Sequence, residues 1–335
     1  PAAVAAPHLM ARRALGPALF EVVQAVDAVL DGPAIVACSG GPDSLALAAA
    51  AVVVGGRRGL AVRAAVVDHG LQDGSAAQAA SVADRLAGLG LPAEVLTVRV
   101  RDGGDGLEAA ARDARYAALE AAASGAEVVL LGHTLDDQAE TVLLGLARGS
   151  GARSLAGMPA RRGRFVRPLL GVRAAVTRQA CVELGLQPWV DPHNSASRFA
   201  RARVRERVLP VLEAELGPGI AEALARSATL LRADADLLDG LAGTERASHP
   251  SPDLDCARLA ALPAALAGRV VRDWLREAGA SDLSAAHVAA VTALATEWRG
   301  QRWAEVPGVR VHRSQGRLVA SSANPASEPA VRTEG

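Results

Sequence analysis

A short segment rich in glycine and serine is the feature of this sequence with the clearest chemistry. Residues 39–44 follow an apolar run and precede a helical pattern. Paired glycines let a backbone approach a ligand closely, and the first amides of a helix suit phosphate. Asp43 can hold a Mg²⁺ ion that bridges to this phosphate. The alternative is a tight strand-to-helix turn in which Asp43 and Ser44 only cap the helix. The predicted phosphate cradle is Ser39, Gly40, Gly41, Pro42, Asp43 and Ser44.

An acidic segment is the second candidate for chemistry. Asp137 and Glu140 are three positions apart in a helical pattern and can share one helix face. We predict that Asp137 completes a metal site with Asp43, and that Asp136 and Glu140 support it. The alternative is a first helical turn whose aspartates are caps. His133, just before the helix, is either a contact for a bound nucleotide or a structural histidine.

Arginine supplies all of the basic side chains, because the 36 lysines and arginines counted together include no lysine. Residues 151–210 hold twelve arginines against three acidic residues, a net charge of +9. Such a stretch indicates contact with a polyanion such as RNA, although a solvated face is the alternative. Arg112, in another helical pattern, offers a planar fork for phosphate. The candidates for RNA contact are Arg201, Arg203, Arg205 and Arg207, whose spacing of two would spread them around a helix.

The elements that must position these residues alternate between strand-like and helical patterns. Near-continuous apolar strands separated by helices predict an α/β fold, in which helices cover both faces of a parallel sheet. Ligands bind beyond the carboxyl ends of such strands, where these polar segments lie. The expected strands are residues 34–39, 61–68, 93–100 and 127–131, and the expected helices are residues 43–54, 74–88, 107–124 and 136–148.

The remainder of the chain predicts a second, smaller domain. Helical patterns at 264–278 and 284–299 precede strand-like runs at 302–306 and 308–311, which indicates a small α+β domain. We expect a catalytic domain over 1–215 with its basic segment at 151–210. The expected remainder is a helical linker at 216–248, the small domain at 249–325 and a tail at 326–335.

Composition excludes several classes of protein. A chain of 335 residues with 50% hydrophobic and 21% charged residues is typical of globular domains and not of disorder. The absence of lysine excludes a Schiff base on the protein and a Walker A loop. Its three cysteines are far apart, which fits a reducing compartment. Because no long apolar stretch suggests a signal or a membrane span, we expect a cytoplasmic protein without membrane contact.

The ordered set of motifs resembles one enzyme family. The hexapeptide resembles the SGGxDS loop of PP-loop ATP pyrophosphatases, whose fold is that of the adenine nucleotide alpha hydrolases. Residues 67–71 (VDHGL), 131–141 (LGHTLDDQAET) and 203–210 (RVRERVLP) extend the resemblance to bacterial tRNA(Ile)-lysidine synthetases. It covers about residues 32–215. One departure is His193, where the family pattern has serine.

What the resemblance implies is a ligase that forms a carbon–nitrogen bond in two steps. ATP adenylates the C2 oxygen of the wobble cytidine in a tRNA(Ile) with a CAU anticodon, and free L-lysine then displaces AMP to give lysidine. The tRNA then reads AUA instead of AUG. Asp43, Arg112 and Asp137 would be catalytic, ATP and Mg²⁺ would be required, and His133 would contact ATP. The acidic cluster would bind Mg²⁺, hold the lysine ammonium or accept its proton.

Two other functions remain open from the sequence. One is a different PP-loop enzyme such as a tRNA 2-thiolase, although such enzymes usually rely on paired cysteines and this chain has no CxxC. The other is a tRNA-binding protein without catalysis, against which the intact Asp43, Arg112 and Asp137 argue. The family resemblance is also compatible with a homodimer.

Overall fold

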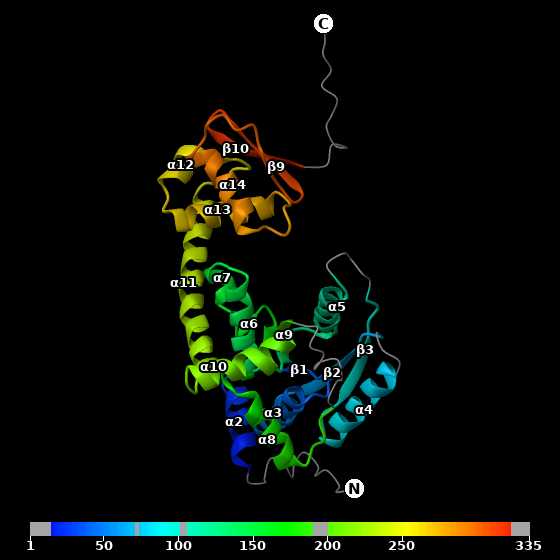
Figure 1. Ribbon diagram of the computed structural model, residues 1–335. Helices are drawn as coiled ribbons and strands as arrows, with labels where there is room; N and C mark the ends of the chain where they lie inside the picture. The colour runs from blue at the N-terminus through cyan, green and yellow to red at the C-terminus, as the bar shows by residue number, and fades with distance from the viewer. Residues whose placement is uncertain (1–14, 71–73, 101–105, 190–199, 323–335) are drawn as a thin grey trace. The chain divides into compact units, whose positions relative to one another are not determined.

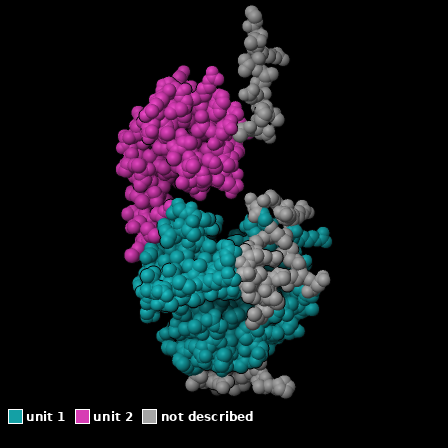
Figure 2. All heavy atoms as spheres, in the orientation of Figure 1, with its two compact units in different colours: residues 1–150, 154–229 teal, residues 151–153, 230–335 magenta. Residues whose placement is uncertain are grey.

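The computed structural model describes residues 15–70, 74–100, 106–189 and 200–322. Contacts divide the chain into two compact units, coloured separately in Figure 2. The first comprises residues 1–150 and 154–229, and the second residues 151–153 and 230–335. Each unit has its own hydrophobic core.

A six-stranded sheet forms the centre of the first unit, in the order β3-β2-β1-β4-β6-β5. The pairs from β3 to β6 are parallel, and β5 pairs with β6 in the antiparallel direction. This confirms the predicted parallel α/β fold. The strands are β1 (Ala34–Ala37), β2 (Val62–Asp68), β3 (Ala93–Thr97), β4 (Val128–Leu131), β5 (Arg161–Arg162) and β6 (Phe165–Val166).

Helices cover both faces of this sheet (Figure 1). Side chains alternate along a strand, so Val128 and Leu130 of β4 enter one core, while Val129 and Leu131 enter the other. The strands are therefore apolar throughout. The first core is closed by α2 (Pro17–Asp27), α3 (Pro42–Arg58), α4 (Ser75–Gly88) and α8 (Ala174–Leu184), and the second by α5 (Leu107–Ala122).

The helix α3 is buried almost all round. Every residue from Ser44 to Gly55 is buried, because α2, α8 and β1 surround the helix. Its small alanines and valines suit these close contacts on all sides. The amino end of α3 is thereby held rigidly at the end of β1, where the glycine-rich segment lies.

A further group of helices shares a small core of its own in the first unit. Val204 and Leu209 join Leu135 and Ala139 in a small core that also includes Ala221. Both carboxylate oxygens of Glu213 accept amides at the start of the long α11, at distances of 2.7 to 3.2 Å. These elements are α6 (Leu135–Ala147), α7 (Ala152–Leu155), η1 (Pro168–Gly171), α9 (Ala200–Arg203), the π-helical η3 (Val204–Val208), α10 (Leu209–Glu215) and α11 (Ile220–Ser248).

The second unit is a small α+β structure, as the sequence predicted. Its antiparallel sheet has the order β7-β10-β9-β8, and its core surrounds the buried Trp274. The Trp274 indole N–H donates to the carbonyl of Pro252 at 2.6 Å. The elements are β7 (Leu254–Asp255), α12 (Cys256–Ala261), α13 (Ala264–Glu277), α14 (Ala285–Thr296), β8 (Ala304–Val306), β9 (Val309–Ser314) and β10 (Arg317–Ser322).

The sequence patterns missed the shortest elements. The strands β5, β6 and β7 have two residues each, too few to show a period of two, and β10 was also not predicted. The predicted helix at 284–299 ends earlier, at Thr296. None of the helices in the described ranges has the length and apolar character that a membrane span needs.

Candidate active site

The candidate residues gather at the carboxyl edge of the parallel sheet. Moving across the sheet, His69 follows β2, the glycine-rich loop follows β1, His133 follows β4, and Arg167 follows β6. This is the edge at which open α/β sheets bind ligands. The sequence therefore placed its polar segments correctly at one edge.

The loop between β1 and α3 is held in one conformation by contacts of its own residues. Gly40 has a φ of +84°, and a Cβ at this position would lie 2.5 Å from a methyl group of Val82. Only glycine fits there without strain. The hydroxyl of Ser44 accepts the amide of Ser39 at 3.2 Å and donates to the carbonyl of Gly41 at 3.0 Å. Ser44 thus uses part of its hydrogen-bonding capacity within the loop. These bonds hold the loop in one conformation.

The start of α3 presents amides that have no acceptor among the described residues. Pro42 occupies the first turn, and the helix has no side-chain cap. Within the described part of the chain, the amides of Gly41, Asp43 and Ser44 donate to no protein acceptor. The end of β4 runs close by, since a Cβ on Gly132 would lie 3.1 Å from the Ser44 amide nitrogen. These amides fit an anion better than a simple turn.

Asp43 is fixed from a distant helix. Its carboxylate accepts the hydroxyl of Thr177, a fully buried residue of α8. The pKa of Asp43 is raised from 3.8 to about 6, mainly by burial and also by the nearby negative charge of Asp137. The Thr177 hydrogen bond and the positive charges of Arg205 and Arg178 act in the opposite direction. Asp43 and Asp137 therefore lie within electrostatic reach of each other.

Asp137 has two structural partners in addition. One of its oxygens accepts the amide and hydroxyl of Thr134 at 2.9 and 3.0 Å, forming a capping box at the start of α6. The other accepts the Arg205 guanidinium at 3.0 Å. The capping alternative considered from the sequence is thus real for Asp137. Although it caps α6, the Asp137 carboxylate still lies within electrostatic reach of Asp43.

Glu140 is completely buried and paired with arginine. Arg205 donates to its two oxygens at 2.6 and 3.1 Å, and Arg201 lies 3.5 Å away. Burial raises the pKa of Glu140, while the Arg205 hydrogen bond and charge lower it. A buried carboxylate is stable in such a place only with partners of this kind.

Asp136 faces α8 instead of the loop. It accepts the amide of Ala174 at 2.7 Å, which caps the amino end of α8, and Arg173 lies 3.5 Å away. Together with the Thr177 hydrogen bond to Asp43, this contact fixes α8 against both α6 and α3. No local pattern in the sequence points to Thr177, because its partner is 134 residues away.

The four predicted RNA-binding arginines divide into two pairs. Arg201 and Arg205, four positions apart, turn toward Glu140. Arg203 and Arg207 are exposed. The prediction that all four contact tRNA remains a prediction, and His193 lies outside the described residues.

His133 and Arg112 lie near the part of the carboxyl edge of the sheet that is next to α5. The pKa of His133 is lowered to about 4, mainly by burial; the negative charge of Asp137 opposes this shift, and the positive charges of Arg167, Arg112 and Arg115 add to it. His133 is therefore neutral at pH 7. Its Nδ1 is buried without a hydrogen-bond partner among the described residues. Arg112 is exposed and lies over the ring of Tyr116, 5.0 Å from the centroid.

The donor set at the loop suits magnesium. In the described ranges no group of three or more histidine, cysteine or acidic side chains is arranged to hold a metal ion. Magnesium, however, is commonly held by one or two carboxylates together with phosphate oxygens and water. Asp43 and Asp137 beside three available amides fit this pattern.

None of the three cysteines forms a disulfide. Cys38, Cys181 and Cys256 are buried and free. Burial raises the pKa of each thiol, to about 12 for Cys181. Cys38 lies near enough to Cys181 to contribute to its raised pKa, but both thiols are neutral, and neutral thiols argue against the sulfur-transfer alternative.

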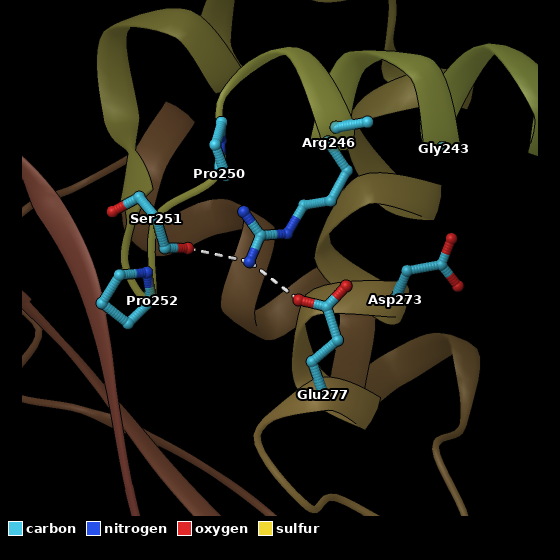
Figure 3. Close-up of a pocket in the computed structure, with 8 residues that line it drawn as sticks. Gly243, Arg246, Pro250, Ser251, Pro252, Asp273 and Glu277 are labelled. Carbon is cyan, nitrogen blue, oxygen red and sulfur yellow. Dashed lines mark hydrogen bonds and ion pairs between the residues drawn. The ribbon is translucent and has the colours of Figure 1, made fainter.

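The second unit contains an open groove of about 640 Å³, shown in Figure 3. Arg246 crosses it, donating to the carbonyl of Ser251 at 2.8 Å and to Glu277 at 2.7 Å. These bonds attach the segment after α11 to α13. The groove is far less specific chemically than the loop of the first unit, because both terminal guanidinium nitrogens of Arg246 are engaged in structural contacts.

Comparisons with known proteins agree with this geometry. Residues 21–212 match the family model of the PP-loop domain, and residues 254–319 match that of the TilS substrate binding domain. A "tRNA(Ile)-lysidine synthase" of Salinispora tropica is 52% identical over 95% of this chain and 98% of its own. A protein of the same name from Thermobifida fusca is 53% identical, covering 86% and 91% of the two chains. One from Mycolicibacterium paratuberculosis is 56% identical, covering 79% and 81%.

Proposed function

The chain belongs to the tRNA(Ile)-lysidine synthase family of PP-loop, ATP-dependent ligases, and from this premise we propose how its residues divide the reaction. The substrates would be ATP, free L-lysine and the wobble cytidine of a CAU-anticodon tRNA(Ile). The observation that carries the proposal is that Asp137 lies within electrostatic reach of Asp43, beside loop amides that have no acceptor among the described residues.

The first step transfers AMP to the RNA base. The O2 oxygen of the cytidine attacks the α-phosphorus of ATP, and the bond to pyrophosphate breaks. The amides of Gly41, Asp43 and Ser44 would bind the leaving pyrophosphate, and Arg112 would stabilise the charge that develops on the phosphate. Asp43 and Asp137 would hold Mg²⁺, which neutralises phosphate charge when bound. The neutral His133 would donate or accept one hydrogen bond to the nucleotide.

The second step forms the carbon–nitrogen bond. The ε-amine of lysine attacks C2, the C2–O bond breaks, and AMP leaves. The amine must lose protons, and Asp137 is the more accessible acceptor because Glu140 is completely buried. Glu140 and Asp136 would support this site through Arg205 and α8.

The RNA would be bound by several parts of the chain. The exposed Arg203 and Arg207 would contact phosphates, and the small domain at residues 249–325 would contact the tRNA elsewhere. Domain boundaries at 215 and 248 belong to this proposal. A cytoplasmic location and a homodimer are further expectations of the same kind.

One assay tests the proposal and its alternatives. Purified protein is incubated with unmodified tRNA(Ile), Mg²⁺, ATP and labelled lysine. The expected result is label in the tRNA that depends on ATP, accompanied by pyrophosphate. Because the chain has no lysine, an amine-reactive probe that labels the product tRNA reacts little with the protein. Binding without pyrophosphate release would instead support a protein without catalysis, and sulfur incorporation would support a thiolase.

A further inference from the structure

Three arginines converge on Tyr116 beside the candidate active site. The guanidinium carbons of Arg112 and Arg115 lie 5.0 and 6.0 Å from the centre of the Tyr116 ring. Arg112 and Arg167 donate to the Tyr116 hydroxyl at 3.3 and 3.2 Å. The ring is fixed from another side by Phe165, with centroids 4.9 Å apart. Three positive charges are therefore held rigidly around one phenol.

The buried Arg167 and the partly buried Arg115 have no counterion among the described residues. Arg167 is only 5% exposed, and burial together with the charge of Arg112 lowers the pKa of Arg115. No salt bridge joins Arg115 or Arg167 to a carboxylate in the part of the chain that the structure describes. The Nε of Arg167 is buried with no acceptor there. A buried cation without an anionic partner is costly, and clustering like charges adds to the cost.

Two histidines add unsatisfied atoms to the same region. The Nδ1 atoms of His69 and His133 are buried and have no partner among the described residues. Arg115 lies near enough to lower the pKa of His69, and all three arginines act on His133 in this way. Several polar atoms and charged groups in the region of Tyr116 thus lack a hydrogen-bond partner or a counterion among the described residues.

We propose that Arg112, Arg115 and Arg167 form a phosphate-binding subsite separate from the glycine-rich loop. Planar guanidinium forks match phosphate oxygens, and a bound phosphate would balance the charges of Arg115 and Arg167. The phosphate is either part of the ATP chain or a phosphodiester of the RNA beside the reacting cytidine. Only the choice between these sources rests on the proposed function.

The first experiment asks whether an anion binds there at all. The urea unfolding midpoint is measured against inorganic phosphate, with chloride holding the ionic strength constant. Arg115→Met is the informative variant, because no hydrogen bond to protein is recorded for Arg115 in the described structure. Phosphate should stabilise the wild type, and Arg115→Met should lose at least half of this shift. Without phosphate the variant should be no less stable than the wild type, because like-charge repulsion has been removed.

The matched control is Arg164→Gln. Arg164 lies three residues before Arg167 but has a carboxylate partner, Glu120, at 3.7 Å. It should keep the full phosphate response. If Arg115→Met does not fold, Arg115→Gln and direct titration with phosphate by calorimetry replace it. A phosphate response as large in the Arg115 variant as in Arg164→Gln would overturn the subsite.

A second experiment identifies the source of the phosphate. Dissociation constants for Mg²⁺-ATP and for an anticodon stem-loop RNA are measured with both variants. Weaker binding of Mg²⁺-ATP by Arg115→Met, but not by Arg164→Gln, assigns the subsite to the triphosphate. Weaker RNA binding with a salt slope reduced by about 0.9 assigns it to a phosphodiester. No difference from Arg164→Gln with either ligand overturns the subsite. Failure of the wild type to ligate lysine, with the phosphate response intact, would instead reject only the proposed function.

Discussion

Thr177 donates its hydroxyl to Asp43 across the interface between α8 and α3. The Thr177 side chain is fully buried and also contacts the carbonyl of Ala174 at 2.9 Å. The amide of Ala174 is held in turn by Asp136 of α6. The direction of the Asp43 carboxylate is therefore set by a helix that carries none of the predicted site residues.

Removing the Thr177 hydroxyl should impair the first chemical step. Thr177→Val keeps the volume but leaves Asp43 without this donor. Since a hydrogen bond to a charged group contributes about 1.5–3 kcal/mol, pyrophosphate release should slow by about ten- to a hundredfold. The Mg²⁺ concentration for half-maximal rate should rise, while tRNA affinity stays unchanged. Steady-state rates against Mg²⁺ and a binding titration measure both.

Two further variants separate positioning from folding. Thr177→Ser retains the hydroxyl and should restore most of the rate. Thr292 in α14 also bonds a carbonyl of its own helix, at 2.7 Å, and Thr292→Val should change neither rate nor Mg²⁺ dependence. A normal Mg²⁺ dependence in Thr177→Val would show that Asp43 does not need this contact.

The Thr177 contact also marks the limit of what the sequence predicts. The glycine-rich loop and the acidic segment were found because their chemistry is local, with all the needed residues within a few positions. The contact of Thr177 with Asp43 arises from packing of two helices and leaves no local pattern. The spacing of Arg201 and Arg205 likewise did not reveal that both turn toward the buried Glu140.

Arg205 and Arg207 should behave differently although they are neighbours in the same π-helical segment. Arg205→Gln leaves the buried Glu140 with only Arg201, so the free energy of unfolding should fall by about 3 kcal/mol. Arg207→Gln changes an exposed residue and should alter stability by less than about 0.5 kcal/mol. It should instead reduce the salt slope of tRNA binding by about 0.9. Urea denaturation and binding at several salt concentrations test the pair.

The double variant Glu140→Gln with Arg205→Gln provides the control, because it removes the unpaired charge. It should be more stable than Arg205→Gln alone. Equal stabilities for Arg205→Gln and Arg207→Gln would contradict the structural role of Arg205.

The two loop glycines should differ in their tolerance of alanine. Gly40 has a positive φ, and an added Cβ would meet Val82 at 2.5 Å. Gly40→Ala should therefore lower stability by about 1–3 kcal/mol and abolish ATP binding. Gly41 has a φ of −72°, and the nearest atom to an added Cβ is 3.7 Å away. Gly41→Ala should fold normally, as thermal unfolding and ATP titration will show. Similar losses of stability in both would mean that the strain at Gly40 is not the cause.

Asp43 should lower the stability of the metal-free protein at neutral pH. Its folded pKa of about 6 lies above the ordinary 3.8, so the folded state holds this proton more tightly than the unfolded chain. The contribution to stability is complete below pH 3.8 and is lost as pH rises through 6. Asp43→Asn, measured in EDTA, should thus gain about 3 kcal/mol over the wild type at pH 8 and little at pH 4. The same variant should lose pyrophosphate release but retain tRNA binding. Equal stability at pH 8 would show that the ionised carboxylate is not costly there, and an unchanged rate would remove Asp43 from the proposed metal site.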